Sequence, residues 1–378
     1  MKILTMEKKE CCGCGACEQI CPKNAITMIK DNEGFSYPSI DENLCISCNL
    51  CEKVCGFDED TLDGKDKAAQ RYFWVKNSNE EERMRSRSGG FFYIIAKWII
   101  SQGGVVYGSI INEDNLVKHI RATDIDSLAL MQGSKYVESD ITGIYTQVRE
   151  DLTNNINVLF TGTGCQVAGL YGFLNGKTYD NLITTDIVCH GTCSSRVFKD
   201  YIDFWENKKN GKVENFNFRN KVKFGWEPAI ESFSINNKDY YRRNYSRLFY
   251  SHNAMRPSCS NCYFANVTRI GDFTLADFWG MKKFYPELDD DKGVSSVFVN
   301  NDKAMDIWTA LTDYMNCGAI SEESVIQPNL LRATSAATTR EAFWKLYGDK
   351  GFEAVFKVYG GYDMKSRFKW FIKMLVTR

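Results

Sequence analysis

The segment CCGCGACEQICP, residues 11–22, determines the character of the N-terminal part of the chain. In it, Cys11, Cys14, Cys17 and Cys21 are separated by two, two and three residues, and Pro22 follows. The same spacing returns in CISCNLCEKVC, residues 45–55. Three thiolates of such a tight loop wrap one cubane cluster, and the fourth reaches the neighbouring cluster. The repeat therefore predicts a bacterial-type ferredoxin module with two 4Fe-4S clusters.

This spacing also predicts which cysteines bind each cluster. We expect one cluster on Cys11, Cys14, Cys17 and Cys55, and the other on Cys45, Cys48, Cys51 and Cys21. The alternative is a pair of structural zinc sites, but zinc motifs usually pair two CxxC units across a longer gap. Gly56 rather than proline follows the second run, although all the ligands are present. Cys12 lies outside the spacing, and we interpret it as a spare thiol near the cluster.

Composition limits the partners and the compartment. The 378 residues include 47 Lys plus Arg and 48 Asp plus Glu, so no global field attracts nucleic acid. Residues 1–10 lack the apolar region of a secretory signal, and the most apolar stretch, Phe91 to Ile100, is interrupted by Lys97 and too short to span a bilayer. We therefore expect a cytoplasmic protein without a transmembrane segment. In a reducing compartment, 15 cysteines indicate metal rather than disulfides.

We expect two domains, separated by the acidic stretch from Asp58 to Lys67. Residues 1–62 would form the ferredoxin domain, an α+β module, and residues 70–378 a larger domain. Beyond Gln70, apolar β-branched runs alternate with helical periodicity, which is typical of α/β folds. Several of the strands are joined by hairpin-length links, so we expect a mixed sheet with helices packed against it.

Strands are predicted at Gly104 to Ile111, Leu116 to Ala122, Asn157 to Thr161, Leu182 to Cys189, Lys212 to Phe218 and Val294 to Val299. Helices are predicted at Gly89 to Ser101, Thr142 to Thr153, Gln166 to Leu174, Ser194 to Asn207 and Asp302 to Asp313. A further stretch, Met364 to Arg378, sets apolar residues on one helical face, and we interpret it as a terminal helix packed on the domain.

Four cysteines of the large domain form a third group. Cys165 follows a predicted strand, Cys189 ends another, and Cys259 and Cys262 form a CxxC unit. Without Cys12, Cys193 and Cys317, the chain has the twelve thiolates that three cubanes need. From spacing alone the alternative stays open that Cys165 and Cys189 are small buried hydrophobes and the CxxC is a redox pair or half of a zinc site.

The segment GTGCQVAG, residues 162–169, invites a dinucleotide-binding interpretation because a glycine-rich turn follows a strand. Val167 occupies the position where the third glycine of that motif should stand. A tight turn that exposes Cys165 is the better account.

Five segments together resemble the coenzyme F420 hydrogenase/dehydrogenase beta-subunit family, over nearly the whole chain. They are SGGFF at 88–92, GSKYVES at 133–139, FTGTGCQVAGL at 160–170, DIVCHG at 186–191 and CSNCYFANVTRIGDFTLADFWG at 259–280. The resemblance implies FAD and a third 4Fe-4S cluster in the large domain, with Cys165, Cys189, Cys259 and Cys262 as its ligands. Gly164 departs from the family pattern, which usually has proline before the cysteine.

The resemblance also points to residues that contact the flavin. Ser88, Gly89 and Gly90 would receive phosphate at a helix N-terminus, and Ser134, Lys135 and Tyr136 would lie near the flavin. A Gly pair before a helix is often only a cap, and a single Lys is usually solvated. His190, beside a ligand cysteine, is the candidate proton donor, although such a histidine more often only hydrogen-bonds and packs.

These inferences predict an iron-sulfur flavoprotein, an oxidoreductase that passes electrons between a ferredoxin-like partner and a small organic substrate. A flavin can exchange single electrons with clusters and electron pairs with a substrate, so a ferredoxin module joined to a flavin domain is a functional arrangement. The family's substrates include deazaflavin coenzyme and chlorophyll-type pigments, and nothing in the sequence selects either. The alternative is a non-catalytic electron-relay subunit that serves a redox enzyme partner, and bound flavin would distinguish the two.

Overall fold

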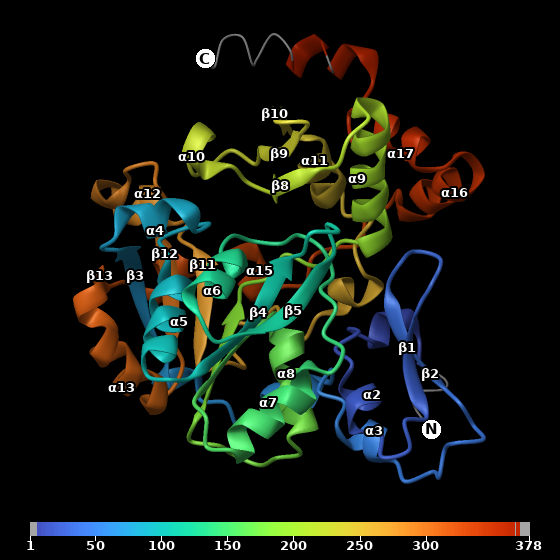
Figure 1. Ribbon diagram of the computed structural model, residues 1–378. Coiled ribbons are helices and arrows are strands. Elements are labelled where there is room, and N and C mark those ends of the chain that lie inside the picture. Colours follow the sequence, from blue (N-terminus) through green and yellow to red (C-terminus); the bar gives the residue numbers. More distant parts are fainter. Residues whose placement is uncertain (1–5, 367, 371–378) are drawn as a thin grey trace.

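The computed structural model describes residues 6–366 and 368–370. Its N-terminal module contains one antiparallel pair, β1 (Ile26–Lys30) and β2 (Ser36–Ile40), and the short helices α2 (Ala16–Ile20) and α3 (Leu50–Lys53). Each helix begins within one of the two cysteine runs, after a residue in the left-handed conformation, Gly15 or Asn49. The module (dark blue in Figure 1) lies beside α8 (Gly164–Phe173) of the larger domain.

The larger domain is built on a mixed sheet of eight strands in the order β13-β3-β12-β11-β7-β6-β4-β5. The strands are β3 (Arg71–Asn77), β4 (Val105–Ile111), β5 (Val117–Ala122), β6 (Val158–Thr161), β7 (Leu182–Ile187), β11 (Phe273–Asp277), β12 (Ser295–Val299) and β13 (Met315–Ala319). Four neighbours, β4, β6, β7 and β11, run parallel, and the remaining pairs are antiparallel. The predicted α/β fold with a mixed sheet is confirmed.

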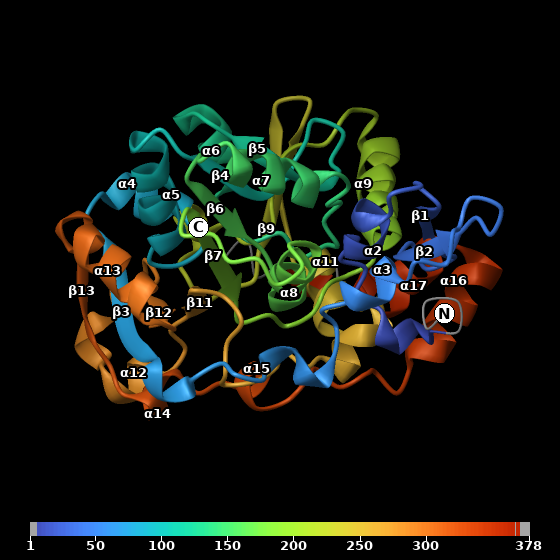
Figure 2. The same cartoon turned by 90° about the horizontal axis from the view of Figure 1, so that it is seen from below.

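Helices cover both faces of this sheet because its central strands are apolar on both sides. In β4, Val106 and Ile110 face α5 (Phe91–Ser101), α6 (Ile125–Met131) and α13 (Asp302–Leu311). Val105 and Tyr107, at the alternate positions, face α7 (Ile144–Thr153) and α8. The N-terminal module extends this second layer, on the opposite side of the molecule from β13 (Figure 2).

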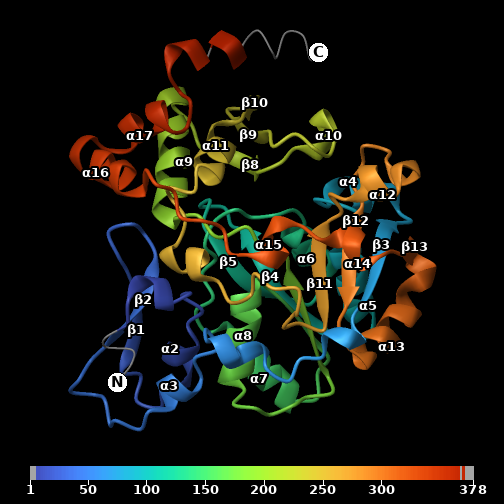
Figure 3. The ribbon, with the colours of Figure 1, turned by 180° about the vertical axis from the view of Figure 1, so that it is seen from behind.

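A second sheet, β10-β9-β8, forms a separate aromatic-rich unit above the first sheet (Figure 3). Its strands are β8 (Glu214–Asn217), β9 (Glu231–Ile235) and β10 (Lys238–Arg242). They pack with α9 (Ser195–Lys209), α11 (Asn244–Tyr250), α16 (Arg340–Lys350) and α17 (Phe352–Val358). Further short helices are α4 (Glu80–Arg85), α10 (Lys221–Phe224), α12 (Met281–Phe284), α14 (Glu322–Val325) and α15 (Pro328–Leu331). The 3-10 helices are Lys8–Glu10, Glu59–Leu62, Lys67–Ala69, Pro257–Asn261, Pro286–Leu288 and Thr312–Tyr314.

The predicted strands and helices all correspond to elements of the structure, with ends that differ by at most two residues. The strand predicted at Lys212 to Phe218 belongs to the second sheet and not to the large one. Most of the predicted C-terminal stretch from Met364 to Arg378 lies outside the described residues. Within the described ranges, no helix is long and apolar enough to cross a membrane.

Candidate functional site

The structure places the cysteines of the N-terminal module in two groups. Burial and then the neighbouring Cys14, Cys11 and Cys55 thiols raise the pKa of Cys17, so these four side chains lie close together. Cys21, Cys45, Cys48 and Cys51 line a separate small cavity. Cys48 in this second group is exposed, as are the nearby side chains of Leu44 and Ile46. The second group therefore lies nearer to the protein surface.

The four cysteines of the large domain also come together. Cys165 is in the first turn of α8, Cys189 follows β7, and Cys259 and Cys262 lie in and after the 3-10 helix Pro257–Asn261. All four line one cavity, which we call the cysteine cavity. Burial and then Cys259, Cys165 and Cys262 raise the pKa of Cys189. Because cysteine ligates metals as the thiolate, binding of a cluster at Cys189 would release the proton of this thiol.

The turn that carries Cys165 is held by a capping box. The Thr163 amide donates to Gln166 Oε1 at 2.9 Å, and the Thr163 hydroxyl lies 3.1 Å from the Cys165 sulfur. Gly164 packs against the ring of Phe264, where a Cβ would come within 2.8 Å of that side chain. Close packing against Phe264 thus accounts for glycine at the position where the family usually has proline.

Cys12, which spacing left unassigned, lies at the junction of two groups. Its side chain interacts with Cys14 of the N-terminal module and with Cys165 of the large domain. It also lines the cysteine cavity. The first N-terminal group and the large-domain group are therefore direct neighbours, which sequence spacing could not show.

Among the described residues, no three His, Cys, Asp or Glu side chains converge on the position of a single metal ion. A zinc site would bring four ligands to within about 2.3 Å of one point. Each of the three groups contains four cysteine thiols, which is the number of protein ligands that a cubane cluster takes.

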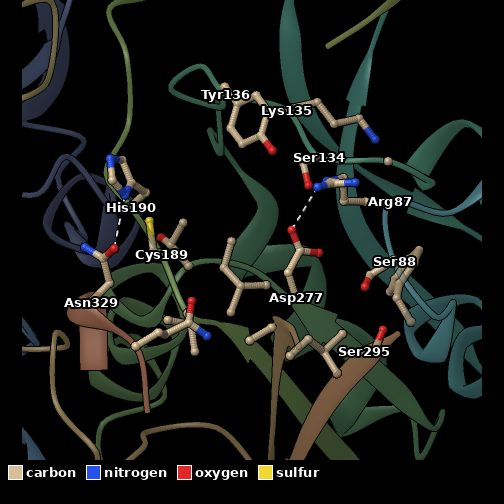
Figure 4. Close-up of a pocket in the computed structure, with 18 of the residues that line it drawn as sticks. Arg87, Ser88, Ser134, Lys135, Tyr136, Cys189, His190, Asp277, Ser295 and Asn329 are labelled. Atoms are coloured by element: carbon tan, nitrogen blue, oxygen red, sulfur yellow. Dashed lines mark hydrogen bonds and ion pairs between the residues drawn. The ribbon is translucent and has the colours of Figure 1, made fainter. Parts of the chain in front are cut away.

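A much larger cavity of about 1000 Å³ lies at the carboxyl ends of the parallel strands (Figure 4). Ser109 of β4, Thr161 at the end of β6, Ile187 at the end of β7 and Asp277 at the end of β11 all line it. This edge of an α/β sheet is where ligands usually bind. The large cavity shares Cys189 and His190 with the cysteine cavity, so one wall separates the two.

The residues predicted to contact flavin divide into two sets. Ser88, Gly90, Ser134, Lys135 and Tyr136 line the large cavity. Gly89 is not among its lining residues: its amide donates to Ser295 Oγ, and a Cβ there would come within 1.9 Å of the Val75 carbonyl oxygen. Because it has no side chain, Gly89 can pack closely against the backbone of β3 and β12.

Two of these lining residues, Lys135 and Gly90, also have structural roles at the ends of helices. Lys135 Nζ donates to the carbonyls of Leu130, Met131 and Gln132, so it caps the C-terminus of α6. Burial lowers the pKa of Lys135 to about 7. Gly90, with φ of 93°, is the N-cap of α5, and the first amides of that helix lack partners within the helix.

An arginine pair that sequence reasoning missed lies on the same cavity wall. Arg87 Nη2 is 3.0 Å from Asp277 Oδ2, and Arg219 Nη1 is 3.9 Å from the same oxygen. Both guanidinium groups are nearly buried, and their Nε atoms have no hydrogen-bond partner within the described part of the chain. Two cations against one carboxylate leave this wall positive and able to bind an anion.

Aromatic rings stand beside the arginine pair. Trp279 is 45% exposed, lines the large cavity and stacks on Trp226 with ring centroids 4.9 Å apart. Arg219 lies over the ring of Trp279. The wall therefore offers an accessible aromatic face next to positive charge, which suits a planar ligand with an anionic tail.

His190 is fixed by hydrogen bonds on both ring nitrogens. Nδ1 is 3.0 Å from Asn329 Oδ1, and Nε2 is 2.9 Å from His252 Nε2. Figure 4 shows His190 beside Cys189 at the edge of the large cavity. Burial lowers the pKa of His190, so the neutral form is favoured.

Comparison with known protein families agrees with these sites. Residues 156–323 match the family model for the C-terminal part of the beta subunit of coenzyme F420 hydrogenase/dehydrogenase, and residues 10–58 match that for a 4Fe-4S dicluster domain. These two matches support the predicted resemblance to the coenzyme F420 hydrogenase/dehydrogenase beta-subunit family with an N-terminal ferredoxin module. With its dicluster domain, the chain is an iron-sulfur redox protein that carries electrons on 4Fe-4S clusters.

One solved structure similar to this chain is that of the F420-reducing NiFe hydrogenase complex from Methanosarcina barkeri, studied by xenon derivatization. The sequences are 16% identical, the TM-score is 0.46, and the match covers 76% of this chain and 90% of the other. The search of curated proteins found no match to this chain.

Proposed function

We propose that this protein is a flavin-dependent oxidoreductase that passes electrons between a ferredoxin-like partner and a small organic substrate through three 4Fe-4S clusters and FAD. One observation carries the proposal: Cys189 and His190 form a wall common to the cysteine cavity and the large cavity. A cluster on Cys165, Cys189, Cys259 and Cys262 would therefore adjoin whatever occupies the large cavity.

The arrangement of the three cysteine groups supports this proposal. The group with Cys48 reaches the surface, the cysteines of the group with Cys14 are only partly exposed, and Cys12 joins Cys14 to Cys165 of the third group. The groups thus form a series from the surface to the large cavity. Such a series suits entry or exit of electrons at the exposed end.

The residues of the large cavity fit FAD. Its volume of about 1000 Å³ is at the upper end of the usual range for ligand pockets. The amides at the start of α5 and the arginine pair Arg87 and Arg219 would bind the diphosphate, and the ring of Trp279 would pack against a planar group. When bound, FAD would supply the exchange between single electrons and electron pairs.

Replacing Arg87 with glutamine is expected to weaken FAD binding about tenfold or more. A charge-assisted hydrogen bond contributes about 1.5–3 kcal/mol, and about 1.4 kcal/mol is a tenfold change in affinity. The measurement is an anaerobic fluorescence titration with FAD. Arg85→Gln is the matched control, because Arg85 is exposed and its ion pair is with Glu81 in the same helix. Equal affinities of the two variants would contradict the proposed phosphate site.

The test of the whole proposal is bleaching of bound flavin by a low-potential donor such as reduced ferredoxin. Bleaching at a rate that depends on the donor concentration is the expected result. A protein that binds its clusters but no flavin would instead be an electron-relay subunit, and the proposed activity would be wrong.

The catalytic role of His190 stays a prediction. Glutamine at this position keeps a hydrogen bond to Asn329 but removes the acid. If His190 donates a proton, reduction of benzoquinone, which takes up two electrons and two protons, is expected to fall about 100-fold. Flavin and iron contents should stay at their wild-type values. Unchanged turnover of His190→Gln would dismiss the role and leave His190 as a hydrogen-bonded packing residue.

A further inference from the structure

Arg256 joins the N-terminal module to the large domain. Its side chain is 1% exposed, which makes it one of the largest fully buried side chains of the described protein. A buried guanidinium is costly unless each of its N–H groups has a partner. The partners of Arg256 therefore show which groups stabilise this buried charge.

Most of these partners belong to the N-terminal module. Nε donates to the Cys11 carbonyl at 2.9 Å, and Nη2 donates to the Ser36 carbonyl at 2.8 Å. Nη2 also lies 3.7 Å from the sulfur of Cys11, within the range of a hydrogen bond to sulfur. The guanidinium stacks over the ring of Tyr37, 4.4 Å from its centroid.

The cysteine loop is shaped to receive this side chain. Gly13 has φ of 72°, and a Cβ on it would come within 2.6 Å of Arg256 Nη1. The glycine between Cys12 and Cys14 thus lets the guanidinium lie against the loop backbone. Gly13 is needed both for its conformation and for this contact.

On the other side, Arg256 belongs to the third cysteine group. It precedes the 3-10 helix of Cys259, and its carbonyl accepts the Cys259 amide at 3.0 Å. Nη1 is ion-paired with Glu138, and the Arg256 side chain lines the cysteine cavity. One residue therefore contacts a proposed ligand of the first cluster and the backbone of a proposed ligand of the third.

We propose that Arg256 is a positioning residue that raises the reduction potential of the first ferredoxin cluster by its charge and its hydrogen bond to Cys11. This inference rests on the proposed assignment of Cys11 as a ligand. Reduction adds one electron to a cluster, so a nearby positive charge favours the reduced form. Hydrogen bonds to the ligand sulfurs act in the same direction and are a recognised determinant of cluster potential.

Because Arg256 is ion-paired with Glu138, we expect substitutions of these two residues to shift the midpoint potential in opposite directions. Arg256→Gln removes the positive charge and leaves Glu138, so the midpoint potential of one cluster is expected to fall. Glu138→Gln leaves the positive charge without its counter-ion, so the same midpoint is expected to rise. Arg256→Lys keeps the charge but loses the planar fork, so its midpoint should lie between those of wild type and Arg256→Gln.

The experiment is an EPR-monitored redox titration of the full chain, loaded anaerobically with iron and sulfide. For Arg256→Gln, we expect the ratio of reduced to oxidised cluster at a given potential to fall about tenfold, a shift of about 59 mV for a one-electron couple. The other two midpoints should move much less. Iron content is measured in each variant, so that loss of a cluster is not mistaken for a shift.

A merely structural role would not give shifts of opposite sign. Unchanged midpoints, or shifts of the same sign in Arg256→Gln and Glu138→Gln, would overturn the inference. If Arg256→Gln does not fold or load, a rise of the midpoint in Glu138→Gln together with a fall below wild type in Arg256→Lys supports the inference, and any other pair of results overturns it. A wild-type protein without three clusters would refute the proposed function first, and its iron content would show this before any variant is titrated.

Discussion

Replacing Cys259 with alanine is expected to remove one 4Fe-4S cluster, which lowers the iron content from about twelve to about eight per chain. Cys259 lies in the cysteine cavity with Cys165, Cys189 and Cys262. A cubane of this kind needs four cysteine thiolates, and the substitution leaves three of the proposed ligands in the cysteine cavity. The two clusters of the N-terminal module should remain, since their ligands are on other segments.

The same variant should also stop flavin bleaching by a low-potential donor, because the third group is the one that adjoins the large cavity. Iron and sulfide assays with EPR of the reduced protein measure the first effect. Cys317→Ala is the matched control, because Cys317 is a half-buried residue of β13, away from all three groups. Twelve irons in Cys259→Ala, or equal losses in both variants, would contradict the ligand assignment.

Replacing Gly172 with alanine is expected to push the N-terminal module away from α8. A Cβ on Gly172 would lie 2.1 Å from the carbonyl oxygen of Val54 in the module. On the same helix, Ala168 packs against Gly56, and Gly169 packs against Cys14. These small residues let the module approach the helix that carries Cys165. The clash involves backbone, so it is relieved only by moving one of the two elements.

We expect Gly172→Ala to cost about 1–3 kcal/mol from overpacking, although alanine alone favours a helix by about 0.5–1 kcal/mol. Gly348→Ala is the control, because Gly348 lies in α16 with open space around its Cβ position. Denaturant unfolding should show the control slightly stabilised and Gly172→Ala destabilised. Flavin bleaching should slow only in Gly172→Ala, since electron tunnelling weakens steeply with distance. Equal stability and equal bleaching in the two variants would contradict this account of the interface.

The interface also shows that the N-terminal module depends on the large domain for much of its hydrophobic core. Its own cluster of buried apolar residues is small, centred on Ile26 and Cys51. Ala16, Val54 and Phe57 instead pack in the core of the large domain, with residues of α7 and α8. The proposed division near residues 62–70 therefore separates two chemical units of one packed structure. Cluster binding and docking together supply the stability that such a short segment lacks.

Local chemistry explains why some of the site was predictable from the sequence. Each cysteine run lies within one short, continuous segment, so the spacing of its cysteines alone indicates how the thiolates are arranged. The strands β4, β6 and β7 were predictable because their apolar, β-branched runs end at turn residues. The neighbouring central strand β11, and β3 and β13 beyond it, were not predicted. Cys165 and Cys189 follow such strands, and parallel strands end at the same edge of a sheet. Their convergence with Cys259 still needed the fold, because no spacing rule links segments so far apart in the sequence.

Tertiary packing decided the features that sequence reasoning missed. Arg87, Arg219 and Asp277 come from three distant segments and have no common motif. The carbonyl partners of Arg256 and Lys135 are backbone atoms, which leave no signature in the sequence. The resemblance implied a phosphate contact at Gly89, but the Gly89 amide donates to Ser295 Oγ, and a Cβ there would clash with the Val75 carbonyl oxygen. Such contacts depend on where the backbone passes.

The most direct test of the central claim is anaerobic purification of the full chain, followed by quantification of iron, sulfide and flavin. Three cubanes and one flavin cavity predict about twelve irons, about twelve sulfides and one FAD per chain. About eight irons without flavin would contradict the proposal, because only the clusters of the N-terminal module would then be present.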